Sequence, residues 1–147
     1  MIHAQNHKVV AELPAAAIGS TASATLVIDT IGYDHASVTV LRASNASTAF
    51  ANAVKVEESD DNSSYSNVTA LVGGGVGGFS IPAVGATATG SASALKMDID
   101  TRAKKRYLRV SYTPGASATV AIVARLGRGE EAPATASDAG VIGLVKG

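Results

Sequence analysis

The sequence predicts an all-β protein, an antiparallel β-sandwich of jelly-roll-like form with an extended N-terminal arm and a C-terminal tail. Short segments alternate apolar and polar residues with a period of two, which is the pattern of a strand with one buried face. Turn-forming residues separate these segments at intervals of about 8–15 residues. No segment shows the apolar periodicity of a long helix, so strands are expected to supply the core.

The predicted organisation has three parts. Residues 1–22 are an N-terminal arm, residues 23–126 are the sandwich domain, and residues 127–147 are a linker and tail. Within the arm, Lys8–Leu13 resembles a short strand, and the alanines after Pro14 form a run too short for an independent helix. We therefore expect an arm that is flexible or docked on a partner.

Two β-branched segments open the sandwich domain. Ala24–Thr30 and Ala36–Ala43 are predicted strands, and the short loop Ile31–His35 between them indicates an antiparallel pair. The alternation assigns their buried faces to Ala24, Leu26, Ile28, Val38 and Val40.

The middle of the chain holds two further predicted strands and a long loop. Val54–Ser59 alternates, and residues 60–64 interrupt it, because Asp, Asn and Ser side chains bond their own backbone in turns. Tyr65–Val72 is predicted to return as a strand. The glycines of Gly73–Gly78 exclude a regular element, and from there to Ser91 we expect loop with one edge strand.

The clearest alternation lies between Ala92 and Arg125. Three runs there have the predicted buried sets Leu95, Met97 and Ile99; Leu108, Val110 and Tyr112; and Val120, Ile122 and Ala124. Thr113–Ala116 contains a Pro-Gly pair, which suits a tight reversal. The second and third runs are therefore predicted to form a hairpin.

Composition excludes several classes of protein. Lys plus Arg and Asp plus Glu both total 12, so the formal net charge of +0 lacks the positive field of a non-specific nucleic-acid binder. The absence of cysteine excludes a disulfide framework and a thiolate nucleophile. No run of about 18 apolar residues and no signal-like N-terminus occurs, so we expect neither a membrane span nor secretion. Aromatic residues are only 4%, which favours a homo-oligomer whose subunit interfaces supplement a thin core.

No group of residues forms a recognisable reaction centre. The acidic run Glu57–Asn62 lacks the spacing of a calcium loop and is better explained as a solvated turn. No lysine follows Gly73–Gly78, so this stretch is a flexible loop in preference to a phosphate cradle. His3, His7 and His35 have no metal-ligand or triad spacing. We therefore expect no catalytic, cofactor-binding or metal-binding residues, and no enzyme.

One local concentration of positive charge lies at Arg102, Lys104, Lys105, Arg106 and Arg109, with Tyr107 between them. A single-stranded nucleic acid could stack on the tyrosine while the cations contact phosphates. Cross-strand ion pairs with Asp98 and Asp100 are the favoured interpretation, since the chain has no excess of positive charge.

Two stretches carry a resemblance to a known group. Val54–Ser64 (VKVEESDDNSS) and Lys105–Tyr112 (KRYLRVSY) resemble small structural proteins of tailed bacteriophages, in which an "ESDD" strand precedes a loop and an "RY-x-R" strand lies near the end of a β-sandwich. The similarity spans roughly Ala24 to Arg125. It implies a virion protein of the head decoration, or cement, type.

The resemblance also implies partners and a location. Such a protein binds the major capsid protein on the outer surface of the virion, is often a trimer, is made in the bacterial host cytoplasm, and contacts neither nucleic acid nor membrane directly. The arm Met1–Ala17 is expected to contact the capsid and the tail Val141–Val145 a neighbouring subunit, with Arg106 and Arg109 as weaker candidates. The interface candidates are therefore Ile2, Val9, Val10, Leu13, Arg106, Arg109, Val141, Ile142, Leu144 and Val145.

Two other functions remain open from the sequence. A head-tail or tail-associated sandwich would be a different virion role for the same fold. A carbohydrate-binding module or adhesin belongs to another class, but sugar binding normally uses aromatic platforms, and the chain has Trp 0, Tyr 4 and Phe 2.

Overall fold

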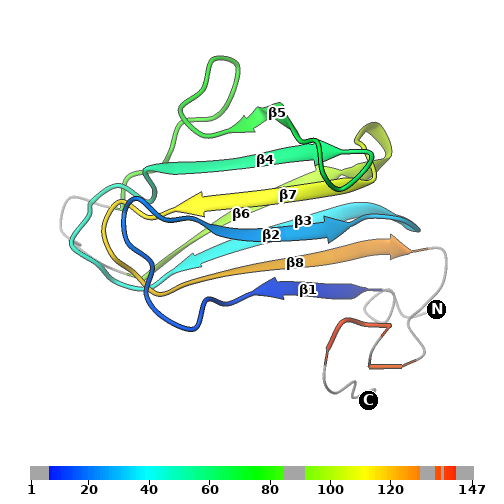
Figure 1. Cartoon of the computed structure of the whole chain (residues 1–147), viewed down its shortest axis with the longest axis horizontal. Coiled ribbons are helices and arrows are strands. Elements are labelled where there is room, and N and C mark those ends of the chain that lie inside the picture. The colour runs from blue at the N-terminus through cyan, green and yellow to red at the C-terminus, as the bar shows by residue number, and fades with distance from the viewer. Residues whose placement is uncertain (1–6, 85–91, 130–134, 137, 142–147) are drawn as a thin grey trace.

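The computed structural model describes residues 7–84, 92–129, 135–136 and 138–141, and within these ranges it contains eight β-strands and one short 3-10 helix (Figure 1). Every predicted strand segment forms a strand, except that the edge strand expected before Ser91 is absent from its described part, residues 79–84, where Phe79 and Ala83 form only isolated bridges. The elements are β1 Lys8–Glu12, β2 Ala24–Asp29, β3 Tyr33–Arg42, β4 Ala53–Ser59, β5 Ser66–Val72, β6 Ser93–Asp100, η2 Thr101–Ala103, β7 Tyr107–Thr113 and β8 Val120–Gly129.

The strands form two four-stranded antiparallel sheets packed face to face. One sheet has the order β1-β8-β3-β6 and the other the order β2-β7-β4-β5. The pairs β1 with β8, β2 with β7, β3 with β6 and β4 with β5 are those of a single long hairpin folded at its middle and then rolled up. Pairing of β3 with β8 and of β4 with β7 completes the two sheets. This is the jelly-roll arrangement, so the predicted fold class is confirmed.

The core fills the space between the two sheets with the side chains that the alternation assigned to it. In β7 the predicted set Leu108, Val110 and Tyr112 is fully buried. The other predicted inward positions are also buried, apart from Leu95, which is partly buried and packs against the core. The sequence period of two therefore fixes the facing of each strand correctly.

The predicted hairpin between β7 and β8 is wrong. β7 lies in one sheet and β8 in the other, so the segment around Pro114 crosses between sheets. The predicted pair β2 and β3 is wrong for the same reason, since β2 pairs with β7 while β3 pairs with β6 and β8. Strands that are neighbours in a jelly-roll sequence commonly alternate between its two sheets, and a short loop can span the thickness of a sandwich, about 10 Å.

The sandwich begins earlier and ends later than residues 23–126. Lys8–Glu12, which was predicted to lie in the arm, is an edge strand that pairs along its whole length with β8. At the other end β8 continues to Gly129. The polar connection before β4 is held by Arg42, whose buried guanidinium Nη1 donates to the carbonyls of Ser47 at 3.3 Å and Ala49 at 2.8 Å.

Candidate functional site

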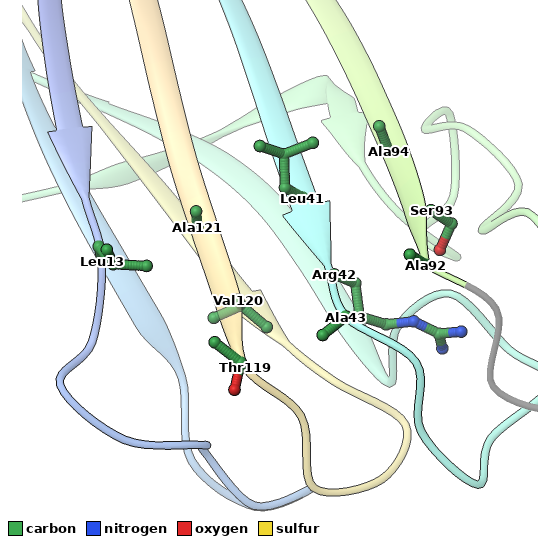
Figure 2. Close-up of a pocket in the computed structure, with 10 residues that line it drawn as sticks. All are labelled: Leu13, Leu41, Arg42, Ala43, Ala92, Ser93, Ala94, Thr119, Val120 and Ala121. Atoms are coloured by element: carbon green, nitrogen blue, oxygen red, sulfur yellow. The ribbon is translucent and has the colours of Figure 1, made fainter.

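The outer face of the β1-β8-β3-β6 sheet carries an apolar hollow at one end (Figure 2). It lies where β1 and β3 end and where β8 and β6 begin. Its volume is about 520 Å³. We call it the apolar groove, and its lining residues are Leu13, Leu41, Arg42, Ala43, Ala92, Ser93, Ala94, Thr119, Val120 and Ala121.

The register of the strands explains why this end is apolar. Leu41 on β3 stands directly beside Ala121 on β8 and Ala94 on β6. Leu41 and Ala121 alternate with buried neighbours, and Ala94 with the partly buried Ser93 and Leu95, so all three face outward. The small alanines on either side leave a depression, with Leu13 at its rim in Figure 2. Leu13 is 68% exposed and Leu41 is 43% exposed. A contiguous exposed apolar patch is a feature of contact surfaces, whereas isolated exposed leucines are common on soluble proteins.

The structure separates the predicted interface residues of the N-terminal segment. Leu13 lines the apolar groove. Val10 turns inward and packs against the core, because its register partner is the buried Ala124. Val9 is paired with the exposed Arg125 and lies nearer the other end of the sheet. Ile2 lies outside the described residues. Leu41 was missed, although the inward set Val38 and Val40 already places it on the outer face.

Arg109 lies on the outer face of the second sheet, inside an ionic network. Its guanidinium donates from Nε to the Glu57 carboxylate at 2.9 Å and lies 4.0 Å from the centre of the Tyr65 ring. Lys55 Nζ donates to the other oxygen of the Glu57 carboxylate at 2.8 Å. Burial of Glu57 opposes its ionisation, but the hydrogen bonds from Lys55 and Arg109 outweigh it, so the pKa of Glu57 lies below its ordinary value.

Arg106 is also ion-paired, with a carboxylate at the end of the neighbouring strand β2. Its Nε and Nη2 form a two-point contact with Asp29, at 3.0 and 2.8 Å. The hydrogen bond from Arg106 is the main reason that the pKa of Asp29 is lowered. The Arg106 guanidinium carbon is 4.8 Å from the centre of the Tyr107 ring.

The basic group is therefore largely ion-paired, as predicted, but with different partners. Arg106 and Arg109 pair with Asp29 and Glu57, and Lys105 pairs with Asp60 at 2.9 Å. Of the predicted partners, Asp100 pairs with Arg102 of this group and Asp98 with Lys96, so neither pairs with Lys105 or Arg109 as expected. The pairing of Lys105 and Arg109 was predicted wrongly because β7 lies between β2 and β4 and not beside β6.

The described part of the C-terminal tail folds back on its own chain. The Val9 amide on β1 donates to the Ala139 carbonyl at 2.7 Å, and Ala139 is 3% exposed. Gly140 follows with φ of +71°, and a Cβ there would lie 1.9 Å from the Val9 carbonyl oxygen. Val141, a predicted contact for a neighbouring subunit, is half-buried next to this contact. Ile142, Leu144 and Val145 lie outside the described residues.

Among the described residues no three His, Asp or Glu side chains are grouped closely enough to hold a metal ion. In the same ranges no helix has the length and apolar character needed to cross a membrane.

Comparison with known proteins gives structural likeness alone. No family model matches the chain, and no curated protein matches it. The solved structures that match include an exo-β-1,3-galactanase from Phanerochaete chrysosporium crystallised with β-1,3-galactotriose, with 13% identity and a TM-score of 0.32. That alignment covers 82% of this chain and 28% of the galactanase chain, so the chain spans under a third of that protein.

Proposed function

We propose that this protein is a non-enzymatic structural protein of a phage virion, a decoration protein that binds the outer surface of the head. The observation that carries the proposal is the apolar groove, which exposes Leu13 and Leu41 at one end of the outer sheet face. The resemblance of Val54–Ser64 and Lys105–Tyr112 to small phage structural proteins supplies the identity of the partner, the major capsid protein.

The proposed mechanism is mechanical reinforcement of the capsid lattice. An apolar ridge on a capsid subunit fills the groove. Complete burial of a fully exposed leucine contributes roughly 1.5–3 kcal/mol, and Leu13 and Leu41, which are 68% and 43% exposed, contribute the corresponding part of it. Each decoration subunit that binds only the intact lattice stabilises that lattice by linkage. Association of the subunits into a trimer multiplies weak contacts, because one bound copy holds the others near their sites.

The two arginines that were interface candidates are less suited to the main contact. Arg106 and Arg109 already have carboxylate partners within the subunit. Breaking these pairs would oppose binding, so they are proposed only as rim residues. The aromatic rings beside them also favour the virion role over carbohydrate binding, since Tyr65 and Tyr107 are each stacked with a guanidinium and do not present two open platforms.

The test uses heads assembled from the major capsid protein of the same source genome, without the decoration protein. Adding the purified protein is expected to raise the temperature at which these heads break open, measured by release of a DNA-binding dye. The variant Leu41→Asp should give little of this increase, because a carboxylate would be desolvated in the groove. If wild-type protein leaves the disruption temperature unchanged, the proposal is wrong, and a tail-associated position becomes the leading alternative.

A further inference from the structure

A second hollow lies on the same outer sheet face, at the end opposite the apolar groove. Its volume is about 260 Å³. It is lined by residues of the three strands β3, β6 and β8 and by the residue before β1, including His7, His35, Lys96, Asp98 and Arg125, with Gly127 among them. We call it the polar cleft.

Gly127 creates the space for one wall of the polar cleft. A Cβ at this position would lie 2.9 Å from both Cε1 and Nδ1 of His7, so a side chain there would displace the imidazole from its place over the strand. His7 Nδ1 is 3.3 Å from the Leu126 carbonyl oxygen. A carbonyl can only accept, so Nδ1 carries the proton in this contact and the ring is held in place against β8.

The charges that line the cleft do not balance. Asp98 is its one carboxylate, and it is already bonded to Lys96 Nζ at 2.7 Å, with His35 Nε2 at 3.9 Å. Arg125 stands next to Ser37, which in turn stands next to Asp98. In the ranges that the structure describes, Arg125 is exposed and has neither an ion pair nor a side-chain hydrogen bond. One full positive charge is therefore uncompensated in a walled depression.

We propose that the polar cleft binds a small oxyanion, a carboxylate or phosphate group, with Arg125 as its principal ligand. The guanidinium offers a planar fork of N–H donors that matches two oxygens of such a group. Lys96 has three ammonium protons, of which Asp98 uses one, and it provides a second donor from the opposite wall. This site does not depend on capsid binding, since the apolar groove lies at the other end of the sheet.

The test is an NMR titration of the purified full chain at constant pH and ionic strength, first with inorganic phosphate and then with acetate. Saturable shifts are expected for backbone amides near Arg125 and Gly127. Arg125→Gln should weaken binding by about tenfold or more. Lys105→Gln removes the same charge from the opposite sheet, where Lys105 pairs with Asp60, and should leave binding unchanged. Gly127→Ala changes no charge but displaces His7, and should also weaken binding.

The two anions distinguish the source of the ligand group. Saturation with phosphate alone supports a phosphate-bearing ligand, and saturation with acetate as well supports a carboxylate side chain or terminus. Absence of saturable shifts with both anions would overturn the proposal. So would an equal loss of binding in Arg125→Gln and Lys105→Gln, because this would show a general charge effect with no defined site. Thermal unfolding of each variant checks that it is folded.

Discussion

One hydroxyl group, that of Tyr112, joins the core to the loop before β4. The Tyr112 ring is fully buried, and its hydroxyl donates to the Phe50 carbonyl at 2.5 Å. The two rings pack in a tilted arrangement with centres 5.3 Å apart. Burial disfavours the phenolate, which raises the pKa of Tyr112 from 10.0 to about 12.

This residue should make stability depend on alkaline pH. In the unfolded chain the phenol ionises near its ordinary pKa of 10.0, whereas the folded protein keeps it neutral until about 12. Its contribution to the free energy of unfolding is therefore full below pH 10 and is lost as the pH rises toward 12. Tyr112→Phe should be less stable than wild type by about 1–2 kcal/mol at neutral pH, and the gap should shrink above pH 10. Urea unfolding across this range measures it, and a gap that does not change with pH would contradict the account.

At this scale the sequence indicates which side chains face inward, but not the partners of the polar ones. Alternation alone places Val110 and Tyr112 in the core, and both are buried. Glu57 was assigned to a solvated acidic turn, yet it is 6% exposed. Its burial depends on Arg109, which stands directly opposite it on β7. Fifty-two positions separate the two residues in the chain, and no local pattern links them.

At the scale of elements, β7 and β8 show where the period-two pattern stops being informative. The pattern gives each strand a buried face, but it holds equally for strands in the same sheet and in opposite sheets. The Pro-Gly pair favours a reversal, and a reversal also occurs when the chain crosses from one sheet to the other. Six residues lie between Thr113 and Val120, which is longer than the two-residue turns of the tightest hairpins. The length of this connection was the sequence feature that argued against the predicted hairpin of β7 and β8.

The C-terminal segment provides the prediction at this scale. Gly140→Ala should undock the segment from β1, because alanine disfavours the positive φ of +71° by about 1–2 kcal/mol and its Cβ would collide with the Val9 carbonyl. Limited proteolysis followed by mass spectrometry should show faster cleavage after β8 in this variant. Gly19→Ala is the control, since Gly19 has no neighbour within 4 Å and no positive φ, and its cleavage rate should match wild type. Equal rates in all three proteins would disprove the docking contact.

At the scale of the whole molecule, the rolled hairpin places the proposed functions at the two ends of one sheet face. The loops after β1 and β3 gather around the apolar groove, whereas the start of β3 and the end of β8 form the polar cleft. The fold class follows from the sequence because alternation and turns are local properties. Neither hollow could be predicted, because each is built from β3, β6, β8 and a residue flanking β1, and only the folded sheet defines the order of these strands.

The most direct test of the central claim is co-sedimentation of the purified protein with heads assembled from the major capsid protein of the same source genome. The comparison uses wild type, the double variant Leu13→Asp with Leu41→Asp, and Val76→Asp as control, because Val76 is 99% exposed on the loop after β5. We predict that wild type and the Val76→Asp variant pellet with heads in fixed stoichiometry. The double variant should bind about tenfold more weakly or worse, since it loses the burial of the remaining exposed surface of two leucines and places two carboxylates in the contact. Equal binding of all three proteins, or no binding by wild type, would contradict the account.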